Sequence, residues 1–353
     1  MPRVTSRKQS PRDQVQNRLL ILAAVFLFLF SAILTLSPAV RVHSWQADYR
    51  WGHWAGFAVW LAAVWLVNQR LQRTMPERDP LLFPLAALLS GWGVLTIWRL
   101  QPGFGLRQTL WLAVSLAVFW WLAGRQSIPA LLQKYKYILL FAGLGITALT
   151  FLFGTYPGGQ GPRLWLGCCG VYFQPSELLK LLFVVFLAAY LAARQPVKAG
   201  LVQLLAPTLL LLVAALGLLL IQRDLGTAIL FTAIYTVVVY LATGKKRILA
   251  ISAGIILAAG VTGYLTLGII QTRIDAWINP WKDSAGSGYQ VVQSIISVGA
   301  GGTFGRGPGL GSPSLVPVAH SDFIFTAIAE ETGLAGSLAL LGLLGIFLLR
   351  GLR

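Results

Sequence analysis

The chain has 353 residues, of which 56% are hydrophobic and only 11% are charged. This hydrophobic share excludes a disordered chain, and the low charge argues against an ordinary soluble globule. The chain has 28 Lys and Arg residues but 11 Asp and Glu residues, a net charge of +17 that would suggest nucleic acid in a soluble protein. The positive charges are scattered between apolar runs, so the sequence favours a membrane protein with no nucleic-acid partner.

Ten apolar runs follow one another along the chain, and a membrane-spanning helix needs about 20 such residues. The sequence therefore predicts an all-α fold, a polytopic transmembrane helix bundle with about 10 spans. The runs cover residues 18–37, 53–69, 80–98, 108–124, 137–154, 176–193, 201–221, 226–243, 248–270 and 323–349.

The charges between these runs indicate an orientation in the membrane. If the N-terminus is cytoplasmic and each run crosses once, most basic residues fall on the cytoplasmic side, as the positive-inside rule requires. There they would contact anionic lipid headgroups. Most acids fall on the opposite side or within the bilayer, where ionisable residues mark function by default. We expect a basic cytoplasmic tail over residues 1–17 and a polar site that faces outward.

The loop over residues 154–181 ends in a helix start with two charged residues. Gln174-Pro175-Ser176 suits a first helical turn. Glu177 and Lys180 lie three residues apart, so they share a helix face and are expected to pair. Such a pair fits either a structural role or a site at the outer mouth of the membrane.

The segment 222–227 places Arg223, Asp224 and Gly226 between two apolar runs. A discontinuous helix here would expose backbone groups that lipid cannot satisfy, which predicts that it lines a cavity. The alternative is an ordinary tight turn at the surface.

The connection over residues 271–322 is far longer than usual in compact folds and contains several aromatic residues, so it is interpreted as functional. Val291, Val292, Ile295 and Ile296 recur at helical spacing, which predicts an amphipathic or re-entrant helix at the outer surface. The glycine-rich stretch 299–313 lacks a phosphate-binding fingerprint. It is interpreted as a loop that closely approaches another segment or moves.

The charged residues on the expected outer side limit the possible chemistry. The sequence has no GxSxG elbow, no HExxH motif and no multi-His zinc pattern. A carboxylate acting as general base, with cations that hold an anionic substrate, is the chemistry that this set permits. The residues alone leave both an enzyme and a transporter open.

Several blocks, in order, resemble the SEDS family (shape, elongation, division and sporulation), which includes RodA and FtsW. The signature region is matched by NPWKDSAGSGYQVVQS (279–294), GGTFGRGPGLGS (301–312) and HSDFIFTAIAEETGLAG (320–336). PRLWLG (162–167), FQPSELLKL (173–181) and QRDLGTA (222–228) match further blocks. The resemblance covers a membrane core over residues 79–353, including the large loop 271–322, and leaves 18–78 as a two-span N-terminal extension.

The resemblance implies a peptidoglycan glycosyltransferase that polymerises lipid II in cell elongation or division. It implies a bacterial cytoplasmic membrane protein with an extracytoplasmic active site and a class B penicillin-binding transpeptidase as partner. Asp283 would be the catalytic base, with a divalent cation such as Mg²⁺ or Mn²⁺ nearby and no organic cofactor. Substrate-binding roles fall on Arg163, Glu177, Lys180, Arg223, Asp224, Lys282 and His320. Supporting roles fall on Asp322, Glu330, Glu331, Gly288, Tyr289 and Gln290, with Asp322 expected near the start of the last span as a helix cap.

Three departures from the family pattern qualify this expectation. Arg223 stands where the family usually has Pro, and Arg163 follows Pro rather than Gln. The last two usual spans have no counterpart before Arg353, which implies a C-terminally incomplete core. The incomplete core favours one alternative, a non-catalytic scaffold for the transpeptidase. The other alternative is a lipid II flippase, for which Glu177, Lys180 and Asp224 would suit a polar pathway.

Overall fold

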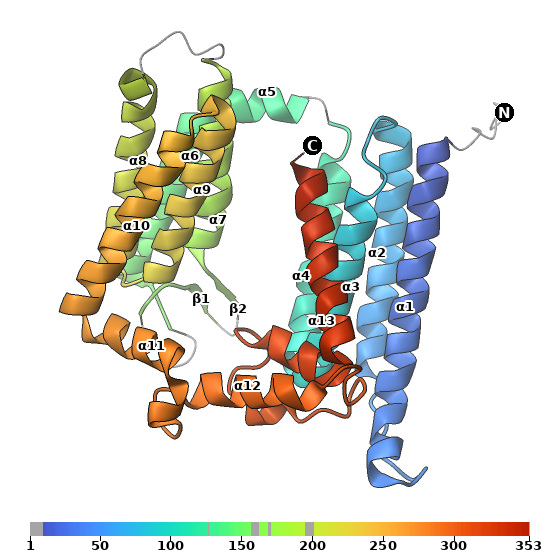
Figure 1. The fold of residues 1–353 in the computed structure, drawn as a ribbon. Helices are drawn as coiled ribbons and strands as arrows, with labels where there is room; N and C mark the ends of the chain where they lie inside the picture. The colour runs from blue at the N-terminus through green and yellow to red at the C-terminus, as the bar shows by residue number, and fades with distance from the viewer. Residues whose placement is uncertain (1–9, 126, 157–161, 169–170, 195–200, 353) are drawn as a thin grey trace, which may run out of the picture. The chain divides into compact units, whose positions relative to one another are not determined.

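The computed structural model describes residues 10–125, 127–156, 162–168, 171–194 and 201–352. These residues form two compact units (Figure 1). One unit combines Met1–Gly124 with Thr272–Arg353, and the other consists of Arg125–Gln271. The first unit is thus made of two stretches that are far apart in the sequence.

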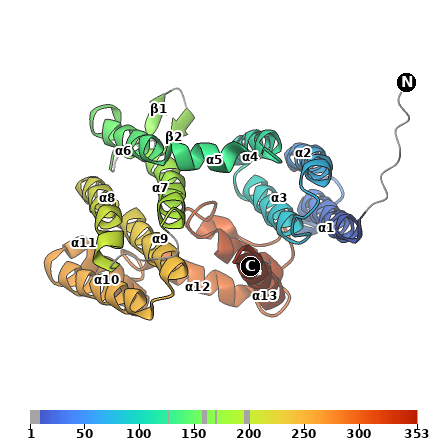
Figure 2. The ribbon, with the colours of Figure 1, turned by 90° about the horizontal axis from the view of Figure 1, so that it is seen from above.

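In the first unit, four helices from the N-terminal stretch pack beside the last helix of the chain. Figure 1 shows these five running alongside one another, with α12 crossing at one end, and Figure 2 shows α13 next to α3. The elements are α1 (Pro11–Val42), α2 (Gly52–Thr74), α3 (Leu82–Leu100), α4 (Pro102–Leu122), α12 (Tyr289–Gly301) and α13 (Ile324–Gly351), with the 3-10 turns η1 (Pro280–Asp283) and η2 (Pro313–Leu315).

Helix α1 begins well before the apolar run that starts at residue 18. Ser10 and Asp13 form a capping box, in which each backbone amide donates to the other side chain at 3.2 Å. Pro11 fits the first helical turn because its missing N–H has no partner there. Residues 11–17 of the expected tail are therefore helical, and residues 1–9 lie outside the described chain.

The core of the first unit forms where α1, α2 and α3 meet. Leu27, Trp60 and Leu95 are fully buried there, and the Trp60 indole N–H donates to the Ala87 carbonyl at 2.8 Å. A Cβ at Gly91 would lie 2.8 Å from the Trp60 Nε1. The glycine thus lets α3 approach the tryptophan closely enough to satisfy its polar atom.

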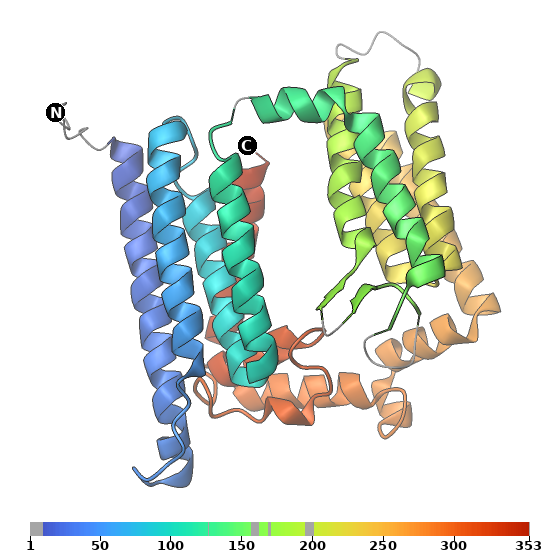
Figure 3. The same ribbon diagram turned by 180° about the vertical axis from the view of Figure 1, so that it is seen from behind.

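The second unit is a helical bundle with one small β-hairpin. Its elements are α5 (Ser127–Lys134), α6 (Lys136–Phe153), β1 (Leu166–Cys168), β2 (Val171–Phe173), α7 (Pro175–Ala192), α8 (Leu201–Ile221), α9 (Leu225–Thr243) and α10 (Lys246–Thr266), and α11 (Gly268–Ile278) continues into the first unit. The strands pair antiparallel, with Leu166 opposite Phe173, in the connection from α6 to α7 (Figure 3). The sequence did not predict this hairpin.

Helices α8 and α9 form an antiparallel pair joined by a tight turn, so the predicted discontinuous helix is wrong. The hydroxyls of Thr208 and Tyr235, which lie at similar distances along the chain from the turn, are 3.0 Å apart. Arg223 adopts a left-handed φ of 59° in the turn. The Asp224 carboxylate then caps α9 by accepting from the Thr227 amide at 3.1 Å. Side-chain capping lets the chain reverse without leaving that helix start unsatisfied.

The all-α, polytopic class is confirmed. Among the described helices, eight are long and apolar enough to cross a membrane, and a ninth is added if α4 and α5 count as one span. The eight are α1, α3, α6, α7, α8 over Gln203–Ile221, α9, α10 and α13. Helix α2, where the run 53–69 predicted a span, is absent from this set because its second half carries Asn68, Gln69, Arg70, Gln72 and Arg73.

Candidate functional site

Asp283 ends the 3-10 turn η1, and five residues separate it from the start of α12. Its Oδ2 accepts two hydrogen bonds from Ser287, at 2.7 Å from the amide and 2.9 Å from the hydroxyl. Its carbonyl accepts from the amides of Gly286 and Gly288, at 3.2 and 3.0 Å. One residue therefore organises the five-residue turn through both its backbone and its side chain.

The glycines of this turn are required by close approach. A Cβ at Gly286 would overlap both carboxylate oxygens of Asp283, and a Cβ at buried Gly288 would overlap the Pro280 carbonyl. Gly288 thus supports the site by letting the turn close on itself. Tyr289 begins α12, and Gln290 follows it with an exposed side chain.

The carboxylate of Asp283 is fully exposed and accepts hydrogen bonds from its own turn. Hydrogen bonds from the amide and the hydroxyl of Ser287 hold the pKa of Asp283 below its usual value. The group is therefore ionised at neutral pH. The Gly286 amide also lowers this pKa, and among the described residues no ion pair involves the Asp283 carboxylate. Lys282, next to it in η1, has an exposed side chain and no ion pair within the described chain.

Two adjacent carboxylates, Glu330 and Glu331, are buried in α13 and hold the glycine-rich loop. Their side chains are only 3% and 7% exposed. Glu331 Oε2 accepts from the Gly309 amide at 2.9 Å, and Glu330 Oε1 accepts from the Ser312 amide at 2.8 Å. The loop therefore approaches α13 closely, which is one of the two behaviours expected for this stretch.

The backbone of α13 is interrupted where the loop meets it. Gly333 has a φ of 68° and a ψ of −165°, which only glycine adopts readily. The Glu330 and Glu331 carbonyls accept from the amides of Arg306 and Gly307, at 3.0 and 2.9 Å. On the other side of the break, the Leu334 amide donates to the Gly302 carbonyl at 2.9 Å. The loop thus satisfies backbone groups that a break in a membrane helix would leave unpaired.

Three arginines surround this contact between the loop and α13, which we call the loop clasp. Arg99 Nη2 lies 3.2 Å from Glu331 Oε1, and Arg306 Nη1 lies 3.5 Å from Glu330 Oε1. Arg41 Nη2, from α1, donates to the carbonyls of Gly309 and Gly311 at 3.2 and 2.6 Å. Arg99 donates to the same two carbonyls, at 3.0 and 3.1 Å.

His320 and Asp322 precede α13 but do not cap it. The helix begins at Ile324 and its N-cap position is Phe323, which makes no side-chain capping bond. The expectation that Asp322 caps this helix is therefore wrong, because Asp322 lies one residue too early. The His320 ring instead lies 4.8 Å from the Phe104 ring, centroid to centroid, and the Asp322 side chain is exposed.

In the second unit, the predicted pairing of Glu177 with Lys180 is confirmed. The ammonium lies 2.8 Å from the Glu177 carboxylate on the first turns of α7. Lys180 is 20% exposed and Glu177 56% exposed, so water reaches the pair. Gln174, just before α7, brings its amide to 3.5 Å from the Asp224 carboxylate. The structure thus brings the start of α7 close to the start of α9.

Arg163 and Arg223 present exposed cations in this unit. Arg163 precedes the bridge between Thr155 and Trp165, where the Thr155 amide donates to the Trp165 carbonyl at 2.7 Å. Neither arginine has an ion-pair partner among the residues that the structure describes. Their charges are therefore available to an anionic ligand.

The described residues contain no group of three or more His, Cys, Asp or Glu side chains that could hold a metal ion. Mg²⁺ often binds through one or two carboxylates together with substrate phosphates, so it needs no such group. Asp283, as an exposed carboxylate in the large loop, is a candidate for a single protein ligand in such an arrangement.

Sequence reasoning missed three residues that this geometry makes prominent. Ser287 had a usable signal, because an Asp side chain commonly accepts hydrogen bonds from residues just after it in a turn. Arg41 and Arg99 had none, because their contacts with Gly309 span 268 and 210 residues.

Comparison with known proteins places the chain among cell-wall enzymes. It is 33% identical to the peptidoglycan glycosyltransferase RodA of Mycobacterium tuberculosis, over 94% of this chain and 76% of the relative. It is 32% identical to the probable peptidoglycan glycosyltransferase FtsW of Halothiobacillus neapolitanus, over 83% and 73%. The stage V sporulation protein E of Bacillus subtilis is 30% identical, over 61% and 67%.

A solved structure and a family model agree with these relatives. The structure concerns the coordination of polymerization and crosslinking by a peptidoglycan synthase complex. It is 28% identical with a TM-score of 0.50, over 84% of this chain and 76% of the matched chain. The sequence model of the cell cycle protein family FtsW/RodA/SpoVE matches residues 88–353. The chain therefore belongs to the FtsW/RodA/SpoVE family, the SEDS family of membrane proteins.

Proposed function

We propose that this chain is a peptidoglycan glycosyltransferase that polymerises lipid II-type substrates, in which sugars are linked to undecaprenyl pyrophosphate. The proposal is supported by its family and by relatives at 32–33% identity that carry this activity in their names. It is supported also by a loop that presents one ionised carboxylate at the end of a rigid turn.

In the proposed reaction, Asp283 takes the proton of an acceptor sugar hydroxyl. The hydroxyl oxygen then forms a bond with the anomeric carbon of the donor sugar, and the bond from that carbon to the pyrophosphate oxygen breaks. Undecaprenyl pyrophosphate leaves with the bonding electron pair. A neutral hydroxyl is a weak nucleophile, so a positioned base contributes typically 10²–10⁴-fold to such a step.

The observation that carries this assignment is the hydrogen bonding of the Asp283 carboxylate, in which Ser287 holds one oxygen. Oδ2 is fixed by Ser287 at 2.7 and 2.9 Å, so the carboxylate has a defined direction. The bonds from Ser287 leave Oδ1 without a hydroxyl partner, and the side chain is exposed to solvent. The lowered pKa keeps the carboxylate in its proton-accepting form.

Cations are needed because negative charge develops on the departing pyrophosphate. We assign this role to Arg163, Lys180, Arg223 and Lys282, on the basis of their charge and accessibility. Glu177 and Asp224 would orient them or the substrate, and His320 would contact the substrate near the start of α13. A divalent cation held mainly by the substrate phosphates would add charge stabilisation.

The membrane arrangement and partner follow from the same proposal. The N-terminus lies in the cytoplasm and the Asp283 loop lies outside the cytoplasmic membrane, as the distribution of basic residues favours. A class B penicillin-binding transpeptidase would crosslink the strands that this chain makes. The similar solved structure is of a synthase complex that combines polymerization and crosslinking.

The test is polymerisation of lipid II by the purified chain with a class B transpeptidase. Asp283→Asn should lower the rate by about 10²–10⁴-fold, because it keeps the shape of the side chain but cannot accept the proton. Asp48→Asn is the matched control, since Asp48 is also an exposed acid. Full activity of Asp283→Asn would contradict the assignment. Lipid II translocation across liposomes without polymer, unaffected by Asp283→Asn, would favour a flippase instead.

A further inference from the structure

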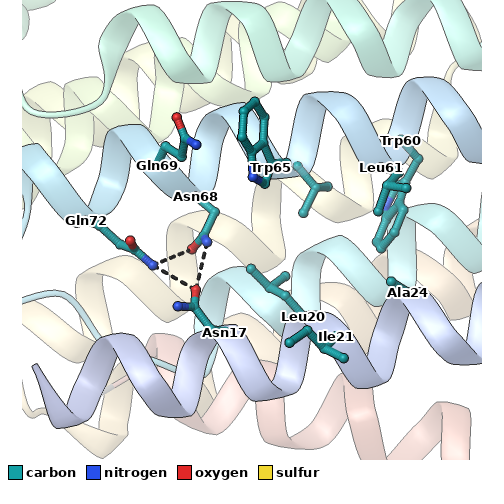
Figure 4. Close-up of a pocket in the computed structure, with 11 residues that line it drawn as sticks. Asn17, Leu20, Ile21, Ala24, Trp60, Leu61, Trp65, Asn68, Gln69 and Gln72 are labelled. Carbon is teal, nitrogen blue, oxygen red and sulfur yellow. Dashed lines mark hydrogen bonds between the residues drawn. The ribbon is translucent and has the colours of Figure 1, made fainter. Parts of the chain in front are cut away.

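A groove between α1 and α2 has a polar end and an apolar end. It encloses a cavity of about 390 Å³. Figure 4 shows the amides of Asn17, Asn68 and Gln72 joined by hydrogen bonds at one end, with Ala24 and Trp60 at the other. The groove lies outside residues 88–353, which match the family model, and the proposed glycosyl transfer does not use it.

The polar end holds more hydrogen-bonding groups than it satisfies. Asn17 Oδ1 accepts from Asn68 Nδ2 at 2.9 Å and from Gln72 Nε2 at 2.8 Å. The half-buried Gln69, which also lines the groove, has no hydrogen-bond partner among the described residues. The free amide of Gln69 can therefore hydrogen-bond to a bound molecule that has oxygen atoms at this end.

Two unpaired arginines extend the polar end of the groove. Arg18 lies three residues before the lining residue Ile21, and Arg73 lies four residues after Gln69. Residues three or four apart share a helix face, so each arginine lies at an edge of the groove, level with its polar end. Both are exposed, and neither has an ion-pair partner within the described chain.

The acidic side chains near the polar end of the groove already form ion pairs with other arginines. Asp13 pairs with Arg78 at 2.6 Å, and Glu77 pairs with Arg12 at 2.7 Å. The charges of Arg18 and Arg73 are therefore left uncompensated beside the groove, which favours an anionic occupant.

The length of the groove matches one leaflet of a bilayer. Its lining on α2 runs from Trp60 to Gln72, which is about 18 Å along a helix with a rise of 1.5 Å per residue. One leaflet contributes about half of the roughly 30 Å hydrocarbon core. Exposed Ile21, Leu61 and Trp65 make the rest of the surface suitable for an acyl chain.

We propose that this groove binds one anionic phospholipid from the leaflet on the side of Arg18 and Arg73. Its phosphate lies between the two arginines, its ester oxygens meet the free amide of Gln69, and one acyl chain follows the groove toward Ala24. A helix of a partner protein fits less well, because the polar groups are confined to one end while the other end is apolar.

The experiment is native mass spectrometry of the full chain in mild detergent, titrated with dimyristoyl phosphatidylglycerol or dimyristoyl phosphatidylcholine. Near an anionic lipid surface each Lys or Arg is worth about fivefold in binding, so Arg18→Gln with Arg73→Gln should weaken phosphatidylglycerol binding about 30-fold. The matched control is Lys246→Gln with Arg247→Gln, two exposed basic residues at the start of α10 that should leave this affinity unchanged.

A second variant tests the groove rather than the charges. Ala24→Leu fills the apolar end and should lower phosphatidylglycerol binding at least fivefold, with the unfolding temperature showing that the protein remains folded. Equal affinity for the two lipids, or unchanged affinity in both the double arginine variant and Ala24→Leu, would overturn the proposal. Detection of a dimer that Ala24→Leu dissociates would also overturn it, since the occupant would then be a second copy of the chain.

Discussion

The loop clasp makes a quantitative prediction, because Glu331 holds the glycine-rich loop through several contacts in a buried place. Its carboxylate lies 3.2 Å from Arg99 Nη2 and 2.9 Å from the Gly309 amide. The side chains of Arg99 and Glu331 are 13% and 7% exposed, so water cannot easily replace either partner. Replacing Glu331 by Ala therefore leaves a buried guanidinium without its counter-ion and a buried amide without its acceptor.

The size of the effect follows from these contacts. Removing one partner of a buried ion pair costs about 3–5 kcal/mol of unfolding free energy. Arg99 keeps its bonds to the carbonyls of Gly309 and Gly311, which places Glu331→Ala at the lower end, about 3 kcal/mol. Glu331→Gln preserves an acceptor for the Gly309 amide. Its loss of unfolding free energy should therefore be smaller than that of Glu331→Ala by roughly 1–3 kcal/mol, the cost of leaving a buried donor unsatisfied.

Denaturant unfolding of the purified protein in detergent, followed by tryptophan fluorescence, measures these differences. Glu77→Ala is the matched control, because the pair of Glu77 with Arg12 is short, at 2.7 Å, but exposed. That control should change the unfolding free energy by less than about 1 kcal/mol. If Glu331→Ala lowered the unfolding free energy no more than Glu77→Ala does, the reasoning would be refuted. The cost of desolvating the buried pair would then cancel its attraction.

Three further variants test the turn, the loop and the exposed pair. Ser287→Ala removes the single hydrogen bond from the hydroxyl, keeps the bond from the amide, and should raise the pKa of Asp283. The pKa of Asp283 in the parent lies below 3.8, the usual value for Asp, so the carboxylate is still mainly ionised at that pH. The variant becomes protonated at a higher pH than the parent does. The acid limb of its pH–rate profile should therefore shift to higher pH. Gly305→Ala forces a Cβ against the Glu331 carbonyl at a φ of 83° and should lower the unfolding free energy by at least about 2 kcal/mol. Glu177→Gln breaks an exposed pair and should cost under about 1 kcal/mol, so a large loss of polymerisation would indicate a functional role.

Matched controls separate these effects from general damage. Ser284→Ala removes a hydroxyl from the same turn without touching the carboxylate and should leave the pH profile in place. Gly302→Ala introduces a Cβ into open space at a φ of 54°, so it should cost only the backbone strain of about 1–2 kcal/mol. A Gly302→Ala variant as unstable as Gly305→Ala would argue against the collision with α13.

Much of the fold could be predicted from the sequence, because membrane helices have a strong local signal. Each apolar run largely coincides with a helix, except that the run 248–270 covers α10 and the start of α11, and the spacing of Val291, Val292, Ile295 and Ile296 correctly predicted α12. In that helix Val292 is buried, whereas Ile295 and Ile296 are exposed. Periodicity thus identified the helix but not which of its apolar residues faces the protein core.

Features that depend on distant contacts were not predictable in the same way. The break at Gly333 gives no sign in its neighbouring sequence, because its unpaired backbone groups are satisfied by the loop at residues 302–307. The turn at Arg223 was misjudged for a related reason. Charged residues between two apolar runs fit both a broken helix and a reversal, and only the contact of Thr208 with Tyr235 distinguishes them. The roles of Asp283 and of the substrate-binding residues, and the division of the core at residue 79, remain predictions.

Arg41 and Arg99 both donate hydrogen bonds to the Gly311 carbonyl, which has a consequence for biosynthesis. Arg41 emerges from the ribosome 270 residues before the carbonyl that it binds. At a synthesis rate of about 5–20 residues per second, that delay is roughly 14–54 s. Residues 125–271 are all synthesised during this time, while Arg41 and Arg99 have no loop carbonyls to bind. Membrane insertion factors and quality-control proteases would therefore meet an incomplete first unit until the last helix arrives.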